Sequence, residues 1–509
     1  MMSVTDDSSH EAAPVTSNSI TDPYGPRRWN SNLVKLAGRN RALNEFSVER
    51  VGEEVKHNLV MLHGYGAGLG FFYKNFEPLS RTPGWKLYAL DMLGMGRSSR
   101  PPFRIHAKDR QGKITEAENW FIDALEEWRV ERKIDKMTLL GHSLGGYMAV
   151  AYALKYPGRL EKLVLASPVG IPEDPYAVSA DLPEPEDATM ASEFTQDQGN
   201  TVAGSSPDVT DERKIGDNNN SLNARSKAAN KDESGKPPRK PLPKCMSLCT
   251  LHTPHPHPHP HPPSSSPPPS TPFYPLLTQA ITLKPHPPGL TYLWDQNISP
   301  FSLVRWSGPF GPRLVSGWTS RRFSHLGREE SQALHDYSYS LFRQRGSGEY
   351  ALAYVLAPGA FARSPLIRRI HAVGRQFYGA HAGPVADGRE SEGVSVGRDE
   401  GRRGSVREGV QRLRENGIPV VLMYGEHDWM DINGGHAAQR RMADEKRRVL
   451  AEESGRTGVP VEELERRDNG EAKVVVIRRA GHHVYLDNPD MFNEVMREEM
   501  GDVEAREGR

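Results

Sequence analysis

Residues 139–147 read Leu-Leu-Gly-His-Ser-Leu-Gly-Gly-Tyr, and this stretch decides the fold. Its centre has the pattern G-x-S-x-G, in which a strand ends, turns sharply and enters a helix with Ser143 at the apex. Glycine is needed on both sides of the serine because side chains there would clash in so tight a turn. The apolar run 137–140 predicts a buried strand before the motif, and residues 144–156 predict a helix after it. This setting favours a nucleophilic serine over a chance match.

Strands and helices alternate on both sides of the motif. Residues 117–134 have a helical pattern, and short apolar runs predict further buried strands at 58–63, 85–91, 162–167, 419–424 and 473–477. Such alternation implies a mostly parallel sheet with helices on both faces, so the predicted fold class is α/β.

Composition excludes several classes of function and location. Lys and Arg total 65 and Asp and Glu total 65, so the formal net charge is zero. The overall charge therefore gives no reason to expect nucleic acid as a partner. The two cysteines, Cys245 and Cys249, are too few for a disulfide framework and favour a reducing compartment. Neither a secretory signal nor an apolar run of about 18 residues occurs, so we expect an intracellular, non-secreted protein without a transmembrane helix. Cytoplasm or a lipid surface fits best. Mitochondria stay open, although Asp6, Asp7 and Glu11 are unusual for a transit peptide.

The chain divides into five predicted segments. They are a disordered N-terminal arm (1–40), a first core part (41–172), a disordered low-complexity insertion (173–290), a cap (291–410) and a second core part (411–509). Residues 26–41 mix arginines with apolar side chains, which predicts either an amphipathic surface-binding segment or a helix packed on the core. Residues 173–290 are rich in Pro, Ser, Asp, Glu, Asn and Lys, and cannot bury enough apolar surface to offset the entropy lost on ordering.

The insertion contains side chains of metal-binding type. Histidines alternate with prolines at 255–261, and Cys245 and Cys249 precede them, but no folded frame would hold these ligands. We therefore expect no metal and no cofactor. An alternative for 245–288 is translated intronic sequence. A transcript lacking this segment would support that hypothesis, and a peptide detected from within it would refute it.

A serine nucleophile needs a base, and the base needs an orienting acid. In the fold that the motif predicts, the order along the chain is serine, acid, histidine. Asp428 follows the apolar run that ends at 424, and His482 follows the last predicted strand. Asp431 is the alternative acid and His483 the alternative base.

The oxyanion formed during acyl transfer needs two backbone N–H donors. One is expected from Leu144, directly after the nucleophile, and the other from the glycine-rich loop 63–68, where Tyr65 is favoured. The turn 91–98, near the same sheet edge, is expected to be structural.

Together these motifs resemble the α/β-hydrolase superfamily. More narrowly, the chain resembles the subfamily of the lipid-droplet lipase co-activator, the N-acyl phosphatidylethanolamine lysophospholipase and the fungal cardiolipin deacylase. The resemblance rests on four stretches, namely 62–75, 91–101, 141–147 and 482–487, and covers roughly 40–170, 290–370 and 410–500. It implies an α/β-hydrolase fold with an inserted cap that contains the long disordered segment. The co-activator branch lacks the serine, so Ser143 makes this chain similar to the catalytic members.

The resemblance also implies an activity. Family members act on acyl lipids, which predicts a serine hydrolase of phospholipid or other lipid esters, similar to the cardiolipin deacylase, at a peripheral membrane or lipid-droplet surface. The alternatives are a lysophosphatidic acid acyltransferase and a non-catalytic co-activator. The subfamily's H-x4-D motif, here His482 and Asp487, is associated with acyl transfer, although we favour a helix-start role for Asp487. An aromatic and arginine-rich cap is expected to cover the acyl chain and attract an anionic headgroup.

Overall fold

The computed structural model describes residues 15–17, 25–173, 299–357, 360–378 and 413–507. All of these residues belong to one unit of the chain, formed by 1–205 and 285–509. The histidine- and cysteine-containing stretch predicted as metal-free, and the candidate intronic segment 245–288, lie outside the described residues.

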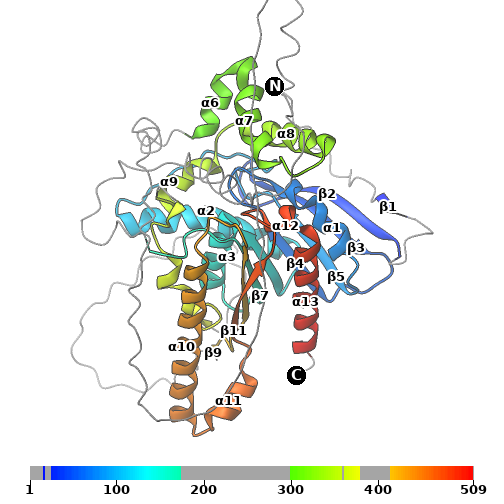
Figure 1. Cartoon of the computed structure of the whole chain (residues 1–509). Helices are drawn as coiled ribbons and strands as arrows, with labels where there is room; N and C mark the ends of the chain where they lie inside the picture. Colours follow the sequence, from blue (N-terminus) through cyan, green and yellow to red (C-terminus); the bar gives the residue numbers. More distant parts are fainter. Residues whose placement is uncertain (1–14, 18–24, 174–298, 358–359, 379–412, 508–509) are drawn as a thin grey trace, which may run out of the picture. The chain divides into compact units, whose positions relative to one another are not determined.

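A mostly parallel sheet forms the centre of the described fold (Figure 1). Its order is β1-β2-β3-β5-β4-β6-β7-β10-β11, and β5, β4, β6, β7, β10 and β11 run parallel. The strands are β1 (Val15–Ser17), β2 (Arg27–Lys35), β3 (Ala42–Arg50), β4 (His57–Leu62), β5 (Trp85–Leu90), β6 (Met137–His142), β7 (Leu160–Ala166), β10 (Pro419–Gly425) and β11 (Glu471–Ile477). A separate two-stranded sheet pairs β8 (Phe377–Tyr378) with β9 (Leu413–Arg414). Each apolar run predicted as a core strand is confirmed.

One prediction about the N-terminal part is wrong. Residues 26–41 form no helix, because 27–35 are strand β2, paired antiparallel with β3. This strand lies near the edge of the sheet, where both faces are partly exposed. Its mixture of arginine and apolar side chains suits such a position and does not reach the density of a buried run.

Helices cover both faces of the sheet and form the cap. The α-helices are α1 (Tyr73–Leu79), α2 (Arg110–Glu131), α3 (Leu144–Lys155), α6 (Pro300–Trp306), α7 (Gly311–Arg322), α8 (Arg328–Phe342), α9 (Leu352–Val355), α10 (Ile432–Thr457), α11 (Val461–Arg467), α12 (Val484–Asp487) and α13 (Pro489–Glu507). Short 3₁₀ turns are η1 (Leu69–Phe72), η3 (Gly308–Phe310), η4 (Gly348–Ala351), η6 (Leu366–Arg368) and η7 (Ile370–Ala372). α6, α7 and α8, drawn in green in Figure 1, pack against one another and belong to the segment between β7 and β10. In the described part of the chain, no helix has the length and apolarity needed to span a bilayer.

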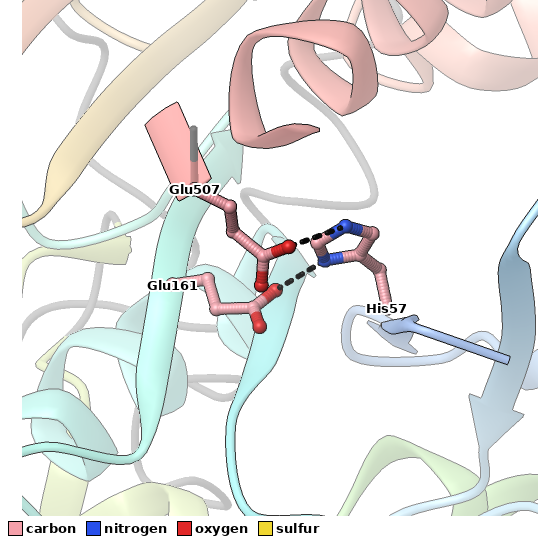
Figure 2. Close-up of side chains that lie close together, drawn as sticks. All are labelled: His57, Glu161 and Glu507. Carbon is pink, nitrogen blue, oxygen red and sulfur yellow. Dashed lines mark hydrogen bonds and ion pairs between the residues drawn. The ribbon is translucent and has the colours of Figure 1, made fainter. Parts of the chain in front are cut away.

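Two charged contacts attach α13 to the sheet. Lys162 of β7 is fully buried, and its Nζ donates to the Glu499 carboxylate at 2.8 Å and to Asp502 at 2.7 Å. Near the end of α13, the His57 ring faces two neighbouring carboxylates, with Glu161 at Nδ1 and Glu507 at Nε2, each at 3.4 Å (Figure 2). The last helix is thus held by buried polar contacts as well as by its apolar side.

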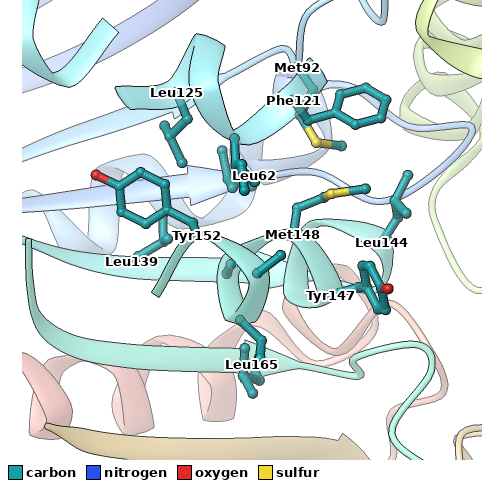
Figure 3. Close-up of a cluster of buried hydrophobic side chains, with 14 of the residues drawn as sticks. Leu62, Met92, Phe121, Leu125, Leu139, Leu144, Tyr147, Met148, Tyr152 and Leu165 are labelled. Atoms are coloured by element: carbon teal, nitrogen blue, oxygen red, sulfur yellow. The ribbon is translucent and has the colours of Figure 1, made fainter. Parts of the chain in front are cut away.

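Alternating side chains of the central strands fill two cores. Val60 and Leu62 of β4 enter one core, whereas Leu59 and Met61 enter the other. This period of two is what a strand covered on both faces requires. Figure 3 shows the first core, where leucines of the sheet pack against α2 and α3. The α3 helix that follows the G-x-S-x-G motif is therefore fixed on its inner side, which fixes the position of Ser143.

Candidate active site

Ser143 occupies a strained turn between β6 and α3. Its backbone has φ 54° and ψ −116°, a region that residues other than glycine rarely adopt. Two backbone contacts hold the turn: Ser143 N–H donates to the Ala166 carbonyl (2.9 Å), and the Gly146 N–H donates to the Ser143 carbonyl (2.9 Å). Strain of this kind costs of order 1–3 kcal/mol and persists only where the surroundings enforce it. Here the turn directs the serine hydroxyl away from the strand.

The neighbouring glycines are required by close packing. A Cβ on Gly145 would lie 2.6 Å from the Leu62 carbonyl oxygen, and a Cβ on Gly141 would collide with the Gly145 carbonyl oxygen. Both atoms belong to backbone, which cannot move aside cheaply. The structure therefore gives a steric reason for the two glycines of the motif.

The glycine-rich loop predicted to supply an oxyanion donor lies against the nucleophile. A Cβ on Gly64 would stand 3.0 Å from Ser143 Cβ and 2.8 Å from His142 Nδ1, so backbone approaches the serine directly. Tyr65 follows in this loop, and Leu144 is the first residue of α3, where N–H groups have no partner within the helix. Both residues thus lie next to the serine, as an oxyanion hole needs.

Asp428 and His482 form a buried pair. Asp428 follows β10 and His482 follows β11, and Asp428 Oδ1 lies 3.1 Å from His482 Nδ1. Burial acts to raise the pKa of Asp428, but the contacts with His482, Ser167 and the Met430 N–H together outweigh it and hold that pKa below its usual value. An ionised Asp428 places the imidazole proton on Nδ1 and leaves Nε2 as the basic nitrogen.

Several buried polar atoms at this place are unpaired. Ser143 Oγ and His482 Nε2 have no hydrogen-bond partner among the described residues, and the same holds for Asp428 Oδ2 and His483 Nδ1. His142 lies between the two candidate residues, because it precedes Ser143 in the chain and its ring lies 4.8 Å from the His482 ring. Leaving buried polar groups unpaired is costly, so this concentration of them needs an explanation.

The alternative residues have other contacts. Asp431 is the N-cap of α10, since its carboxylate accepts from the Asn433 (2.9 Å) and Gly434 (3.0 Å) N–H groups. The His483 ring packs against Phe71 and His142. Of the two acids, Asp428 is the one that contacts a histidine of the 482–483 pair.

His142 is a site residue that we did not expect from the sequence. Its Nε2 donates to the His482 carbonyl oxygen (3.1 Å), which ties the serine turn to the histidine loop. Burial, then the charge of His482, drives the pKa of His142 well below its ordinary value, so the ring is neutral. Its place inside the G-x-S-x-G motif was the available signal.

Asp91 organises the two loops beside the serine. Its carboxylate is fully buried and accepts from the Leu69 N–H, the Arg97 N–H and the Asn44 amide, each at 2.8 Å. These contacts agree with a structural role for the turn 91–98, and they also fix the glycine-rich loop.

Aromatic side chains of the cap cover the site. Phe301 of α6 stacks on Tyr65 with ring centroids 5.0 Å apart, and Phe342 of α8 stacks on Phe301 at 4.4 Å. Tyr337 of α8 accepts from the Gly70 N–H at 3.0 Å. Ser143 itself is 1% exposed.

A helix starts where the sequence predicts one, because α13 begins at Pro489, but the cap role favoured for Asp487 is wrong. Asn488 caps α13 instead, accepting from the Met491 N–H (3.3 Å). Asp487 Oδ2 accepts from the Gly481 N–H at 3.0 Å, and Oδ1 lies 3.6 Å from Nε2 of His325 in the cap. Burial raises the pKa of Asp487 despite these neighbours and Arg322. The carboxylate thus supports the loop of His482 and links it to the cap.

A group with metal-ligand side chains lies at the start of β4. His57, Glu161 and Glu507 have ligand atoms within 4.8 Å of one another. The two carboxylates face different nitrogens of the His57 ring (Figure 2). A metal ion held by all three side chains would bind only one of the two ring nitrogens, with both carboxylates next to that nitrogen. The arrangement fits two ion pairs better than a metal centre.

Comparisons with known proteins agree with this fold. A family model described as alpha/beta hydrolase fold matches residues 58–249. A 1-acylglycerol-3-phosphate O-acyltransferase of Arabidopsis thaliana is 26% identical over 477 residues, which cover 92% of this chain and 72% of that protein. The 1-acylglycerol-3-phosphate O-acyltransferase ABHD5 of Mus musculus is 48% identical over 160 residues, 31% of this chain and 42% of that one. The human (lyso)-N-acylphosphatidylethanolamine lipase is 24% identical over 445 residues, 86% of this chain and 78% of that one.

Solved structures give a weaker likeness. An esterase of Thermogutta terrifontis is 13% identical with a TM-score of 0.42, covering 93% of this chain and 99% of that chain. Among the sequence relatives, the chain spans most of the plant acyltransferase and of the human lipase, but less than half of the mouse acyltransferase.

Proposed function

We propose that this chain, which is similar to the α/β-hydrolases in fold and sequence, is a serine hydrolase of acyl lipids. Ser143 is the nucleophile, His482 the base and Asp428 the orienting acid. One observation carries this proposal. At one edge of the sheet, a serine in a strained turn and a histidine backed by a carboxylate at 3.1 Å both have an unpaired reactive atom.

The proposed reaction is acyl transfer in two steps. Ser143 Oγ attacks the acyl carbonyl while His482 Nε2 takes its proton, and the same imidazole then protonates the leaving alcohol. The N–H groups of Tyr65 and Leu144 stabilise the oxyanion. Water, activated by His482, releases the fatty acid. Asp428 stabilises the imidazolium that forms in each step.

The cap supports a lipid as substrate. Phe301 and Phe342 stack over Tyr65, and an acyl chain is the kind of group that such an apolar wall accepts. Arg322 adds positive charge, since it acts on the pKa of both His142 and Asp487. We infer a phospholipid with an anionic headgroup, and cardiolipin is the candidate that the family resemblance suggests.

A second candidate is acyl transfer to lysophosphatidic acid. The relatives from Arabidopsis thaliana and Mus musculus are named as acyltransferases of that type. Asp487 holds the Gly481 N–H beside His482, so the spacing from His482 to Asp487 has a structural basis here. In this version, a lysolipid hydroxyl replaces water, and an acyl donor such as acyl-CoA is required. A co-activator role without turnover is the third candidate.

The test is fatty acid release from mixed phospholipid liposomes that contain cardiolipin. Wild type and Ser143→Ala are compared, with and without lysophosphatidic acid and acyl-CoA. We expect release by the wild type and a loss of at least about 10³-fold in the variant. Phosphatidic acid formed only with both additions would favour the acyltransferase instead.

The controls are matched neighbours. His482→Gln should abolish release, whereas His483→Gln should retain it, because Asp428 contacts His482. Biological activity that survives Ser143→Ala would favour the co-activator and contradict both catalytic candidates.

A further inference from the structure

An apolar patch protrudes from the cap at α6, η3 and the start of α7. We call this surface the docking patch. It consists of Leu303 (40% exposed), Trp306 (69%), Phe310 (68%) and Leu314 (54%). Among the eleven exposed large apolar side chains of the described residues, Trp306 and Phe310 are the most exposed. Four such side chains occur within twelve residues of the chain, unlike the single exposed apolar residues that are normal on protein surfaces.

The patch has a buried counterpart that fixes its direction. Phe301 in α6 and Val315 and Thr319 in α7 point inward and are buried. Phe301 is also the residue that stacks on Tyr65 beside the nucleophile. The same short segment therefore covers the site with one side and presents the docking patch with the other.

The segment that carries the patch is basic. Residues 299–328 contain five arginines and no aspartate or glutamate. Arg305 pairs with Glu349 at 2.6 Å, but within the described residues no acidic side chain pairs with Arg313 or Arg321. Both of these arginines are exposed and, with Leu314, share the outer face of α7, opposite Val315 and Thr319.

We propose that the docking patch inserts into the surface of a membrane or lipid particle with anionic headgroups. Tryptophan, phenylalanine and leucine partition into the headgroup–acyl boundary, and arginine at its rim attracts anionic lipid. Charge complementarity selects this occupant over an uncharged apolar partner. The inference rests on the proposed function in one respect, since docking would bring the cap and the site beneath it to the lipid substrate. The binding to vesicles itself depends only on the surface residues named above.

The experiment is co-flotation of the full chain with phosphatidylcholine vesicles, with and without phosphatidylglycerol. Trp306→Ser/Phe310→Ser should weaken vesicle binding at least about tenfold, because two large apolar side chains no longer partition. Arg313→Glu should weaken binding to the anionic vesicles about fivefold or more and change binding to neutral vesicles little. The matched control, Leu33→Ser/Phe377→Ser, removes side chains 59% and 56% exposed on other elements and should bind like the wild type.

Two further readouts separate the possible outcomes. Hydrolysis of a soluble short-chain ester should be the same in the docking variants and the wild type, whereas Ser143→Ala should lose it and still float with vesicles. Loss of flotation with retained ester hydrolysis supports docking. Unchanged flotation of the double variant overturns it, as does equal loss in the control, or a change of oligomeric state in light scattering that assigns the patch to a second copy of the chain.

Discussion

At the residue scale, the site depends on where single backbone atoms lie. Ser143 is held at φ 54° between two glycines that tolerate no side chain, and Gly64 brings the neighbouring loop to within contact of it. Asp428 Oδ1 and His482 Nδ1 contact each other, whereas Asp428 Oδ2 and His482 Nε2 have no partner among the described residues. This asymmetry separates a catalytic pair from an ordinary buried ion pair.

Asp428 should be essential for rate and not for folding. Asp428→Asn keeps the shape but loses the charge that stabilises the imidazolium, so kcat should fall by about 10⁴-fold. Asp431→Asn is the matched control, because asparagine caps a helix as well as aspartate, and it should hydrolyse esters at nearly the wild-type rate. Equal losses in both variants would argue against Asp428 as the orienting acid.

Neutral His142 should make stability depend on pH. Because burial lowers the pKa of His142 in the folded chain, the unfolded chain binds the proton more readily. Its stabilising contribution is complete above the unfolded pKa of about 6.5 and is lost as pH falls through the folded value, by at most about 1.4 kcal/mol per pH unit. Burial lowers the pKa of His63 too, which adds a contribution of the same sign.

Urea unfolding between about pH 5 and 7 measures this dependence. His142→Gln can still donate to the His482 carbonyl, and its unfolding free energy should fall less steeply in acid than that of the wild type. His436→Gln replaces an exposed histidine as the control. A slope unchanged by His142→Gln would show that the ring does not titrate with unfolding.

At the scale of elements, apolar runs were sufficient to locate the parallel strands of the core. β6 and β10 are buried along their whole length, so their composition alone identifies them. β2 was misassigned because a partly exposed strand near the edge of the sheet needs no such run. Asp487 was misassigned for a different reason: its contacts with Gly481 and with His325 of the cap are tertiary, and its local sequence suits a helix start equally well.

The attachment of α13 to the sheet should depend on Lys162. Lys162→Met removes one of the two lysines on the buried Glu499 carboxylate, and Lys473 keeps its contact at 2.5 Å. The loss of unfolding free energy should therefore stay below the cost of a fully uncompensated buried charge, about 3–5 kcal/mol. Lys155→Met removes a partly exposed pair with Asp123, which should cost about 1 kcal/mol or less. Denaturant unfolding compares the two, and similar small losses would refute the anchoring role of Lys162.

At the scale of the whole described chain, the core positions the candidate catalytic groups, and cap side chains stack on Tyr65 beside them. The core and the order of the candidate triad were predictable because each residue follows a strand end in a known order. The aromatic stacking of the cap on the loop beside Ser143 was not predictable, because it joins residues more than 200 positions apart, such as Tyr65 and Phe301. Composition predicted an aromatic, basic cap but could not separate its inner from its outer side chains.

The central claim is that Ser143 is the nucleophile, and a fluorophosphonate that phosphonylates activated serines tests it most directly. After labelling, digestion and mass spectrometry, the account predicts one adduct on the peptide containing Ser143. The adduct should be absent in Ser143→Ala and strongly slowed in His482→Gln, while His483→Gln labels normally. Labelling of a different serine, or no labelling of a folded wild-type chain, would contradict the account.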